Sequence, residues 1–310
     1  MFWFLTKSLR AVITLLLVVT FVFFVLRLSG DPTYMLLPDD IDEATRTFYR
    51  QLWGLDKPIF VQYLNYLGAL LQGDFGISFR NNQDAFQLVW DRVPKTALLT
   101  GTSLVISLVI GIPLGIVAAL YRDSWIDRAV MAASVFGFSM PNFFLGILLI
   151  LIFSLNLRVL PSSGSGTWRH LIMPASTLGI SFAAQFARYT RSSMIDVLNK
   201  SYMRTAQSKG AGTARRVNLH ALPNAAIPVI TILGLKVGEL LGGAVITETV
   251  FAWPGLGRLL TSAVASRDLA VVQCIMILLA ITMVVANMLT DLTYGWLDPR
   301  VRVGAKAGSR

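Results

Sequence analysis

Six long apolar stretches alternate with polar segments along the chain. They fall near residues 8–28, 96–121, 128–155, 171–193, 225–250 and 269–296. Each has roughly 20 residues or more, the length that a helix needs to cross about 30 Å of hydrocarbon. The pattern predicts an all-α membrane protein with six transmembrane helices.

The polar segments divide the chain into three parts. Residues 1–29 hold the N-terminus and the first span, whose apolar run is too long for a cleaved signal peptide and lacks a small-residue cleavage site. Residues 30–95 form the longest polar stretch, which we expect to be an external, partly helical segment with a weakly amphipathic piece at Ile59–Leu71. Residues 96–310 contain spans two to six and a long internal connection near 194–224.

The composition excludes an ordinary soluble domain. Hydrophobic residues make up 55% of the 310 residues, charged residues make up 14%, and the mean hydropathy is +0.63. The net charge of +10 comes from basic residues dispersed over loops, so nucleic acid is not an expected partner, whereas membrane lipid is. Many of these basic residues share one side if the N-terminus is inside, which predicts an N-in, C-in topology. Cys274 stands alone in the last apolar run, which excludes an intramolecular disulfide.

The segment from Tyr202 to Pro223 is basic and polar, and it lies between apolar stretches. Helix formers continue through Lys209, two glycines then favour a stop, and Thr213 is a candidate N-cap for a second basic helix that we expect Pro223 to end. The pattern predicts two short helices at an angle. Such an elbow, protruding where a span re-enters the membrane, is suited to docking another protein.

Several catalytic and ligand-binding devices are missing from the sequence. It has no phosphate-binding loop of the Gly-x-x-x-x-Gly-Lys-Ser/Thr type, and Gly234-Leu235-Lys236 has the wrong spacing. His170 and His220 are isolated, so no metal site is expected. Without a histidine in a span to activate it, Ser139 is not expected to be a nucleophile. We interpret Gly137 to Pro141 as a softened helix and keep Ser139 as a candidate for a translocation path.

Ionisable side chains within spans are costly and are therefore candidates for function. Lys236 and Glu239 are three residues apart on one helix face, where they can pair and line a watery path, although a purely structural ion pair is equally consistent with the spacing. Glu248 and Asp291 lie near span ends, where water is close. Together with Ser139, Lys236 and Glu239 are the candidate residues of a translocation path.

The elbow resembles the cytoplasmic signature of membrane permease subunits in bacterial ABC importers. That signature reads Glu-Ala-Ala, three residues, Gly, nine residues, Ile, one residue and Leu-Pro. Here Arg204-Thr205-Ala206 is followed by Gly210 and then by His220-Ala221-Leu222-Pro223, so the spacing, the glycine and Leu-Pro are kept. Arg, Thr and His replace three positions of the pattern.

Asp291, with Leu297-Asp298-Pro299-Arg300 at the end of the sixth span, is similar to permeases of the first type among the paired permeases of such importers. Other motifs place the resemblance in the branch that serves dipeptides, oligopeptides, nickel and glutathione. They are Gly30-Asp31-Pro32, Gly54-Leu55-Asp56-Lys57-Pro58, Gly73-Asp74-Phe75-Gly76 and the segment from Thr247 to Arg258. The similarity covers nearly the whole chain.

The resemblance implies a type I ABC importer permease fold in a bacterial inner membrane, with the elbow as a cytoplasmic coupling helix. It implies four partner subunits: a second homologous permease, two cytoplasmic ATPase subunits that bind ATP and Mg, and an external substrate-binding protein. This chain itself is expected to bind no cofactor and to catalyse no reaction. The residues implied to couple to an ATPase are Tyr202, Arg204, Thr205, Ala206, Lys209, Gly210, Arg215, Arg216, Leu222 and Pro223.

Peptides are the predicted substrate, because the start of the elbow, Tyr-x-Arg-Thr-Ala with Lys-Gly, is similar to that of the peptide branch in particular. Nickel is less favoured because the spans hold no histidine, while glutathione, opines and short oligosaccharides stay open. The alternatives from other classes are a channel or gradient-driven carrier, which predicts repeats that the sequence does not show, and a membrane enzyme, which lacks a nucleophile and a base.

Overall fold

The computed structural model describes residues 2–28, 30–31, 33–38 and 40–297. These residues are helices and connections, and the extended pairing among them is an isolated bridge between Ile77 and Asp84. The predicted all-α class is therefore confirmed. The predicted cytoplasmic C-terminus beyond residue 297 lies outside the described residues. The chain divides into two compact units, Met1–Thr96 with Pro254–Val284, and Ala97–Trp253 with Val285–Arg310.

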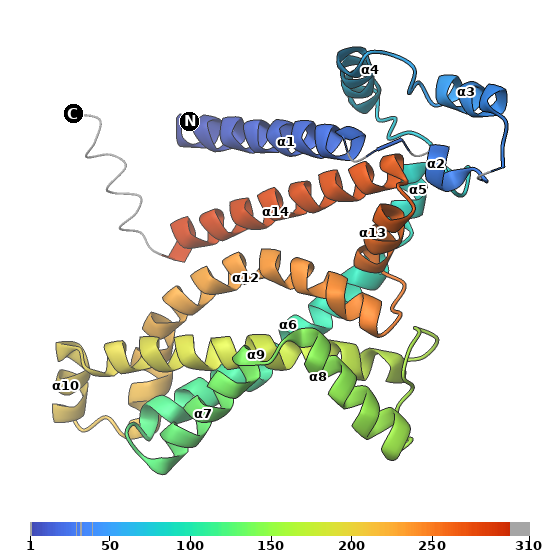
Figure 1. Ribbon diagram of the computed structural model, residues 1–310. Coiled ribbons are helices and arrows are strands. Elements are labelled where there is room, and N and C mark those ends of the chain that lie inside the picture. The colour runs from blue at the N-terminus through green and yellow to red at the C-terminus, as the bar shows by residue number, and fades with distance from the viewer. Residues whose placement is uncertain (1, 29, 32, 39, 298–310) are drawn as a thin grey trace. The chain divides into compact units, whose positions relative to one another are not determined.

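The first unit contains the N-terminal helix, the polar segment and two C-terminal helices (Figure 1). Its helices are α1 (Phe2–Leu28), α2 (Thr33–Leu36), α3 (Glu43–Leu52), α4 (Ile59–Leu71), α5 (Ala85–Trp90), α13 (Leu256–Ala265) and most of α14 (Leu269–Leu297). The partly helical nature predicted for residues 30–95 is confirmed, and α4 has the predicted bounds.

Side-chain caps explain where two of the short helices begin. The Asp42 carboxylate accepts hydrogen bonds from the Thr45 backbone N–H at 3.2 Å and from the Thr45 hydroxyl at 2.6 Å, which starts α3. These bonds hold the pKa of Asp42 below its ordinary value. Asp84 caps α5 in the same way, accepting from the Gln87 N–H at 2.9 Å.

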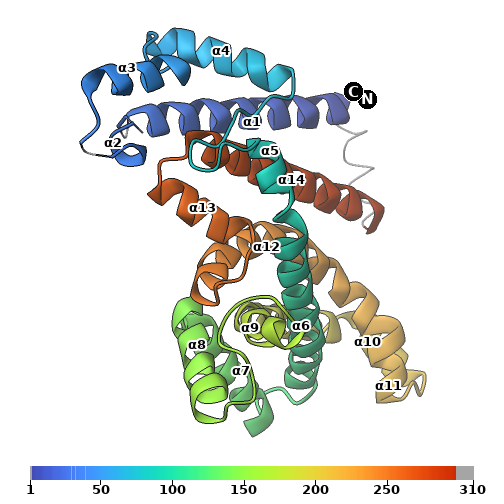
Figure 2. The ribbon, with the colours of Figure 1, turned by 90° about the vertical axis from the view of Figure 1, so that its right-hand side faces the viewer.

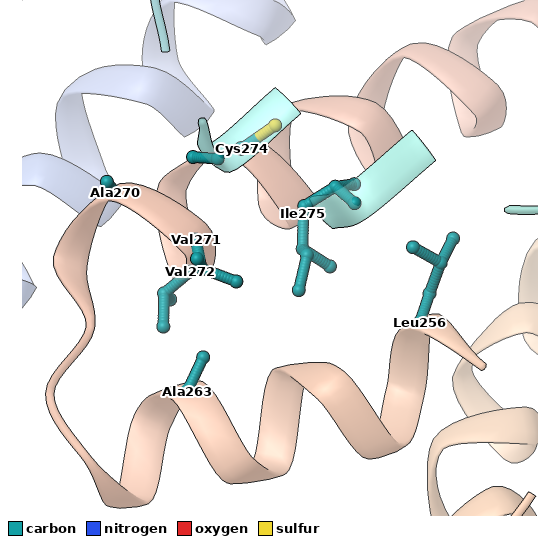
Figure 3. Close-up of a cluster of buried hydrophobic side chains, with 9 residues drawn as sticks. Leu256, Ala263, Ala270, Val271, Val272, Cys274 and Ile275 are labelled. Carbon is teal, nitrogen blue, oxygen red and sulfur yellow. The ribbon is translucent and has the colours of Figure 1, made fainter. Parts of the chain in front are cut away.

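A buried apolar cluster joins α13 to α14 (Figure 3). Leu256 and Ala263 on α13 face Val272 and Ile275 on α14, and the Cys274 thiol is buried in the same cluster, as expected for a packed residue. The turn between α13 and α14 also forms hydrogen bonds with the polar segment 30–95. The Asp268 carboxylate, which is 3% exposed, accepts from the Ser78 hydroxyl and from the Phe79 N–H at 3.3 Å.

The second unit contains the remaining helices. They are most of α6 (Val93–Leu120), α7 (Trp125–Ser139), α8 (Asn142–Leu149), the π-helix η1 (Ile150–Asn156), α9 (Arg169–Leu198), α10 (Ser201–Ser208), α11 (Thr213–Arg215), the π-helix η2 (Arg216–Ala221) and α12 (Leu222–Val250). Figure 2 views α9 nearly end-on, with α6, α7, α8 and α12 around it. More than half of the 30 residues of α9 are buried.

Small residues allow α6 and α9 to pack closely. A Cβ at Gly111 would lie 2.6 Å from the Ala183 carbonyl oxygen, and one at Gly115 would lie 2.5 Å from the Ala187 oxygen. From the other side, a Cβ at Gly179 would lie 2.6 Å from Ile106. Glycine at these positions lets the backbones approach, as is common between membrane helices.

The predicted span 128–155 is not one softened helix. It is a pair of helices, Trp125–Ser139 and Asn142–Asn156, bent by 100° at Met140 and Pro141. Met140 is extended, with ψ at 121°, because a residue before proline is disfavoured in the α region. The prediction of a continuous helix here is wrong, and Ser139 is the last residue of the first piece.

Four helical segments are long and apolar enough to cross a membrane, or five if the bent pair counts as one span. They are Leu9–Leu28, Ala85–Leu120, Thr213–Gly234 and Leu269–Thr290. The predicted span 171–193 corresponds to α9, whose polar residues are covered by neighbouring helices, so low hydropathy is compatible with its place in the unit. The count of six spans and the N-in, C-in orientation stay predictions.

Candidate functional site

The predicted elbow begins with a short helix and a glycine turn. Helix α10 ends at Ser208, and Gly210 follows with φ at +79°, a left-handed conformation that glycine adopts without steric cost. The Gly210 N–H donates to the Gln207 carbonyl at 2.9 Å. Gly212, and not Thr213 as predicted, occupies the N-cap position of the next helix.

The second half of the elbow corrects a prediction. Thr213 to Gly234 form one continuous helical run, in which α11, η2 and the start of α12 follow one another. Pro223 does not end a short helix: it lies at the start of α12, directly after the π-helix η2, and the helical run continues through it. The second helix of the elbow therefore continues directly into a long apolar helix.

An apolar cluster attaches the elbow to the rest of its unit. Met203 on α10 is 3% exposed, and Val217 and Ala221 on η2 are also buried. They pack with Ala119, Met194 and Ala225, which lie near ends of α6, α9 and α12. We call these six residues the elbow cluster. The cluster therefore joins α10 and η2 to α6, α9 and α12.

The two residues that the sequence predicts for packing in the elbow are less buried than the members of the elbow cluster. Ala206 is half-buried, and Leu222 is a half-buried neighbour of the cluster. Sequence reasoning missed Met203 and Val217. Their signal was available, since each is an isolated apolar residue within a polar run.

The opposite side of the elbow is exposed and basic. Arg204, Lys209 and Arg215 are exposed, as is Thr205, and Tyr202 is 42% exposed. These are the residues that the sequence predicts for contact with another protein. Leu219 on η2 adds an apolar side chain that is 62% exposed and that the sequence did not single out.

Arg216 has a different role from the other predicted arginines. Its Nη1 donates to Gln207 Oε1 at 2.7 Å, and its Nη2 lies 3.4 Å from the Thr213 hydroxyl. It therefore ties α10 to the helix that follows the glycine turn. The Arg216 side chain is half-buried in this position.

A buried ion pair joins Asp127 on α7 to Arg191 on α9. Helix α9 also contributes Met194 to the elbow cluster. The Asp127 carboxylate accepts from Arg191 Nε at 2.5 Å and from Arg191 Nη2 at 2.6 Å, and also from the Asp123 N–H at 2.9 Å. The pair joins the start of α7 to α9. Sequence reasoning did not single out Asp127, because nothing in a single sequence identifies a partner 64 residues away.

The candidate path residues are less informative. Ser139 is exposed at the break between α7 and α8, and Lys236 is half-buried in α12. Glu239 lies on the same helix, but its side chain is outside the described residues. The predicted pairing of Lys236 with Glu239 stays a prediction.

The environment of Glu248 differs from the one that the sequence predicts. It was expected near water, yet it is fully buried, as are the Trp253 and Phe251 side chains that follow it. The Trp253 N–H donates to the Glu248 carbonyl at 2.8 Å, a hydrogen bond that closes a turn at the end of α12. Trp253 packs with Leu99, Ala175, Leu178 and Ala244 in a second apolar cluster. The Thr247–Arg258 motif thus has a structural role at this turn.

Two family models match the chain. The model described as "Binding-protein-dependent transport system inner membrane component" matches residues 111–303, and one described as "Binding-prot-dependent transport system membrane comp, N-term" matches residues 1–100. Together they cover the whole polar segment, the elbow and most of the apolar helices.

Among curated relatives, the chain is similar to the "Glutathione transport system permease protein GsiC" of two bacteria. The protein of Salmonella choleraesuis (strain SC-B67) is 42% identical over 299 residues, which are 96% of this chain and 98% of the relative. The protein of Escherichia coli (strain K12) is 42% identical over 290 residues, 93% of this chain and 95% of the relative.

Solved structures with a similar fold are more distant in sequence. A structure of inward-facing conformations of the MetNI methionine ABC transporter (CY5 native crystal form) has a TM-score of 0.60 at 20% identity, covering 68% of this chain and 97% of that chain. An amino acid ABC transporter crystallised with histidines has a TM-score of 0.52 at 18% identity, covering 67% and 93%. At these identities the likeness concerns the fold.

Proposed function

The chain belongs to the family of binding-protein-dependent transport system inner membrane components, and from this premise we propose that it forms half of the pathway through which an ATP-driven importer carries di- or oligopeptides. It is a permease subunit of a bacterial ABC importer of the dipeptide, oligopeptide and glutathione branch, and so a multi-pass component of the inner membrane. Its relatives are transporter subunits without an enzymatic reaction of their own.

Four partner subunits complete the proposed transporter. They are a second homologous permease, two cytoplasmic ATPases and an external protein that delivers the substrate. ATP and Mg bind to the ATPases in this scheme. Tagging the full chain, extracting it in mild detergent and identifying the co-purifying proteins by mass spectrometry tests the scheme. Recovery of the chain alone, or with copies of itself only, would contradict it.

The elbow is the proposed site of coupling to an ATPase. The observation that carries this proposal is the division of the elbow into two sides, a buried apolar side and an exposed basic side with Arg204, Lys209 and Arg215. The basic side offers charged donors to acidic or carbonyl groups of a partner. The elbow cluster then transfers the motion of that partner to α6, α9 and α12.

Two proline substitutions test the coupling. Gly210→Pro removes the N–H that bonds to Gln207 and forces φ from +79° to about −65°, so we expect a chain that reaches the membrane while ATP hydrolysis no longer drives uptake. Gly212→Pro is the matched control, because φ at Gly212 is already −63° and ψ is 160°. The measurement is peptide uptake and ATPase activity in vesicles. Normal uptake by Gly210→Pro would refute the coupling role.

The peptide assignment is supported by the relatives, which are glutathione transport permeases, because glutathione is itself a tripeptide. We propose that Lys236 and Glu239 pair transiently with the carboxylate and the amine of a passing peptide. The double variant Lys236→Met with Glu239→Gln is expected to slow uptake of zwitterionic peptides. Unchanged uptake of every substrate would remove this hypothesis, while nickel, opines and oligosaccharides are tested in the same assay.

A further inference from the structure

Helix α4 packs against α1 within the length of a candidate membrane span. The Tyr63 hydroxyl lies 2.7 Å from the Thr20 hydroxyl, and the Tyr66 ring stacks on Phe23 with centroids 5.4 Å apart. Both contacts lie on the apolar run Leu9–Leu28 of α1. Thr20 lies about 12 Å from Leu28 along the helix axis, at about 1.5 Å per residue. Part of α4 is therefore well inside the length of this span.

The outward face of α4 is apolar. Phe60 is 70% exposed, Leu64 is 64% exposed and Leu71 is 90% exposed, and their spacing places them on one side of the helix. No Asp, Glu, Lys or Arg occurs between Ile59 and Leu71. The Gln62 side chain bonds through Nε2, which donates to the Leu55 and Lys57 carbonyls at 3.3 Å and 2.7 Å, and Asn65 is an exposed polar side chain of this helix.

This apolar face continues a face of α1 that is equally open. Phe21 is 69% exposed, Val25 is 46% exposed and Leu28 is 78% exposed, and all three belong to the span. Phe24 of α1 meets Phe60 of α4 edge-on, with centroids 6.4 Å apart, so the two helices present neighbouring apolar surfaces. A surface that adjoins the lipid-facing side of a span at the same depth is expected to face lipid as well.

The length of α4 and the polar residues on either side of it limit its orientation in a bilayer. With 13 residues it is too short to cross a bilayer, which takes roughly 20. Asp56 and Lys57 are exposed just before it, and Gln72 and Asp74 are exposed just after it. Polar groups at both ends favour a helix whose two ends return to the headgroups while its apolar side faces acyl chains.

We propose that α4 is immersed in the acyl chains of the leaflet at the Leu28 end of α1, with the face of Phe60, Leu64 and Leu71 in contact with lipid. The segment 30–95 is then not a wholly aqueous cap, because its middle helix is anchored in the bilayer beside the first span. The remaining parts of the segment are tethered to this anchor. The placement is independent of the substrate and of the coupling proposed above.

Depth-dependent fluorescence quenching tests the proposal. In a Cys274→Ala background, Leu64→Cys carries a bimane probe in the full chain reconstituted into phosphatidylcholine vesicles. Asp56→Cys is the control, since it is exposed a few residues before α4. We expect doxyl-labelled phosphatidylcholine to quench the probe at position 64 and iodide to lose its effect there, with the reverse at position 56.

Two outcomes would overturn the proposal. Iodide quenching at position 64 as strong as at position 56 would place α4 in water. A probe that neither quencher reaches would mean that protein, such as a second permease or another copy of this chain, covers the face. Leu71→Cys, at the most exposed position of the helix, repeats the measurement in case the substitution at Leu64 prevents folding.

Discussion

The Asp127–Arg191 ion pair shows how a single residue can hold a long helix in place. The Asp127 side chain is 4% exposed and its partner is 25% exposed, so the pair is shielded from water on one side only. The carboxylate accepts two parallel bonds from the guanidinium and a third from a backbone N–H, which satisfies most of its capacity. Such a pair fixes the register of α7 on α9.

Asp127→Asn is expected to destabilise the chain by on the order of 3 kcal/mol, because removing one partner leaves a partly buried guanidinium unpaired. Asp123→Asn is the matched control, since the Asp123 side chain is 79% exposed in its contact with Arg122. The measurement is the temperature at which half of the detergent-solubilised protein loses its monodisperse elution peak. Equal midpoints for the two variants would show that the pair contributes nothing.

At the scale of elements, glycine decides the distance between α6 and α9. Gly111→Ala introduces a Cβ 2.6 Å from a backbone oxygen, and we expect a loss of about 1–3 kcal/mol from the forced separation of the helices. Gly101→Ala on the same helix has open space, and there alanine is expected to gain about 0.5–1 kcal/mol. Thermal midpoints in detergent should therefore move in opposite directions. A gain at both positions would contradict the close packing.

The elbow is the second element whose packing can be tested. Met203→Ala removes a buried side chain from the elbow cluster, and truncations of this kind cost about 2–5 kcal/mol. We expect α10 to loosen and trypsin to cleave faster after Arg204 and Lys209. Leu219→Ala is the control, because Leu219 is largely exposed. Unchanged cleavage of Met203→Ala would mean that the cluster does not hold the elbow.

At the scale of the whole molecule, the distribution of charge makes a prediction about orientation. The basic elbow is expected inside and the acidic segment 30–95 outside, because positively charged loops stay on the cytoplasmic side. With Cys274 replaced by Ala, we expect a membrane-impermeant maleimide to label Asp56→Cys in cells with a permeabilised outer membrane. Lys209→Cys should react only after the inner membrane is opened. Labelling of both before lysis would refute the topology.

The sequence alone determined the class of the protein, the approximate limits of its long helices and the place of the elbow. These properties follow from local quantities, namely the length of apolar runs, the positions of glycine and proline, and motif spacing. Hence the predicted stretch 269–296 and the helix α14 (Leu269–Leu297) nearly coincide, and the bounds of α4 agree. The predicted glycine turn at Gly210 is likewise a local property, since it depends on one positive φ.

The tertiary structure decided what each element touches. The helical run continues through Pro223, where the sequence predicted an end, because a proline after a π-helical turn and a terminating proline look the same in sequence. The pairing of Asp127 with Arg191, the burial of Met203 and Glu248, and the placement of α4 on α1 join residues far apart in the chain or depend on such contacts. Contacts of this kind arise only when folding brings distant surfaces together, so no local pattern could have specified them.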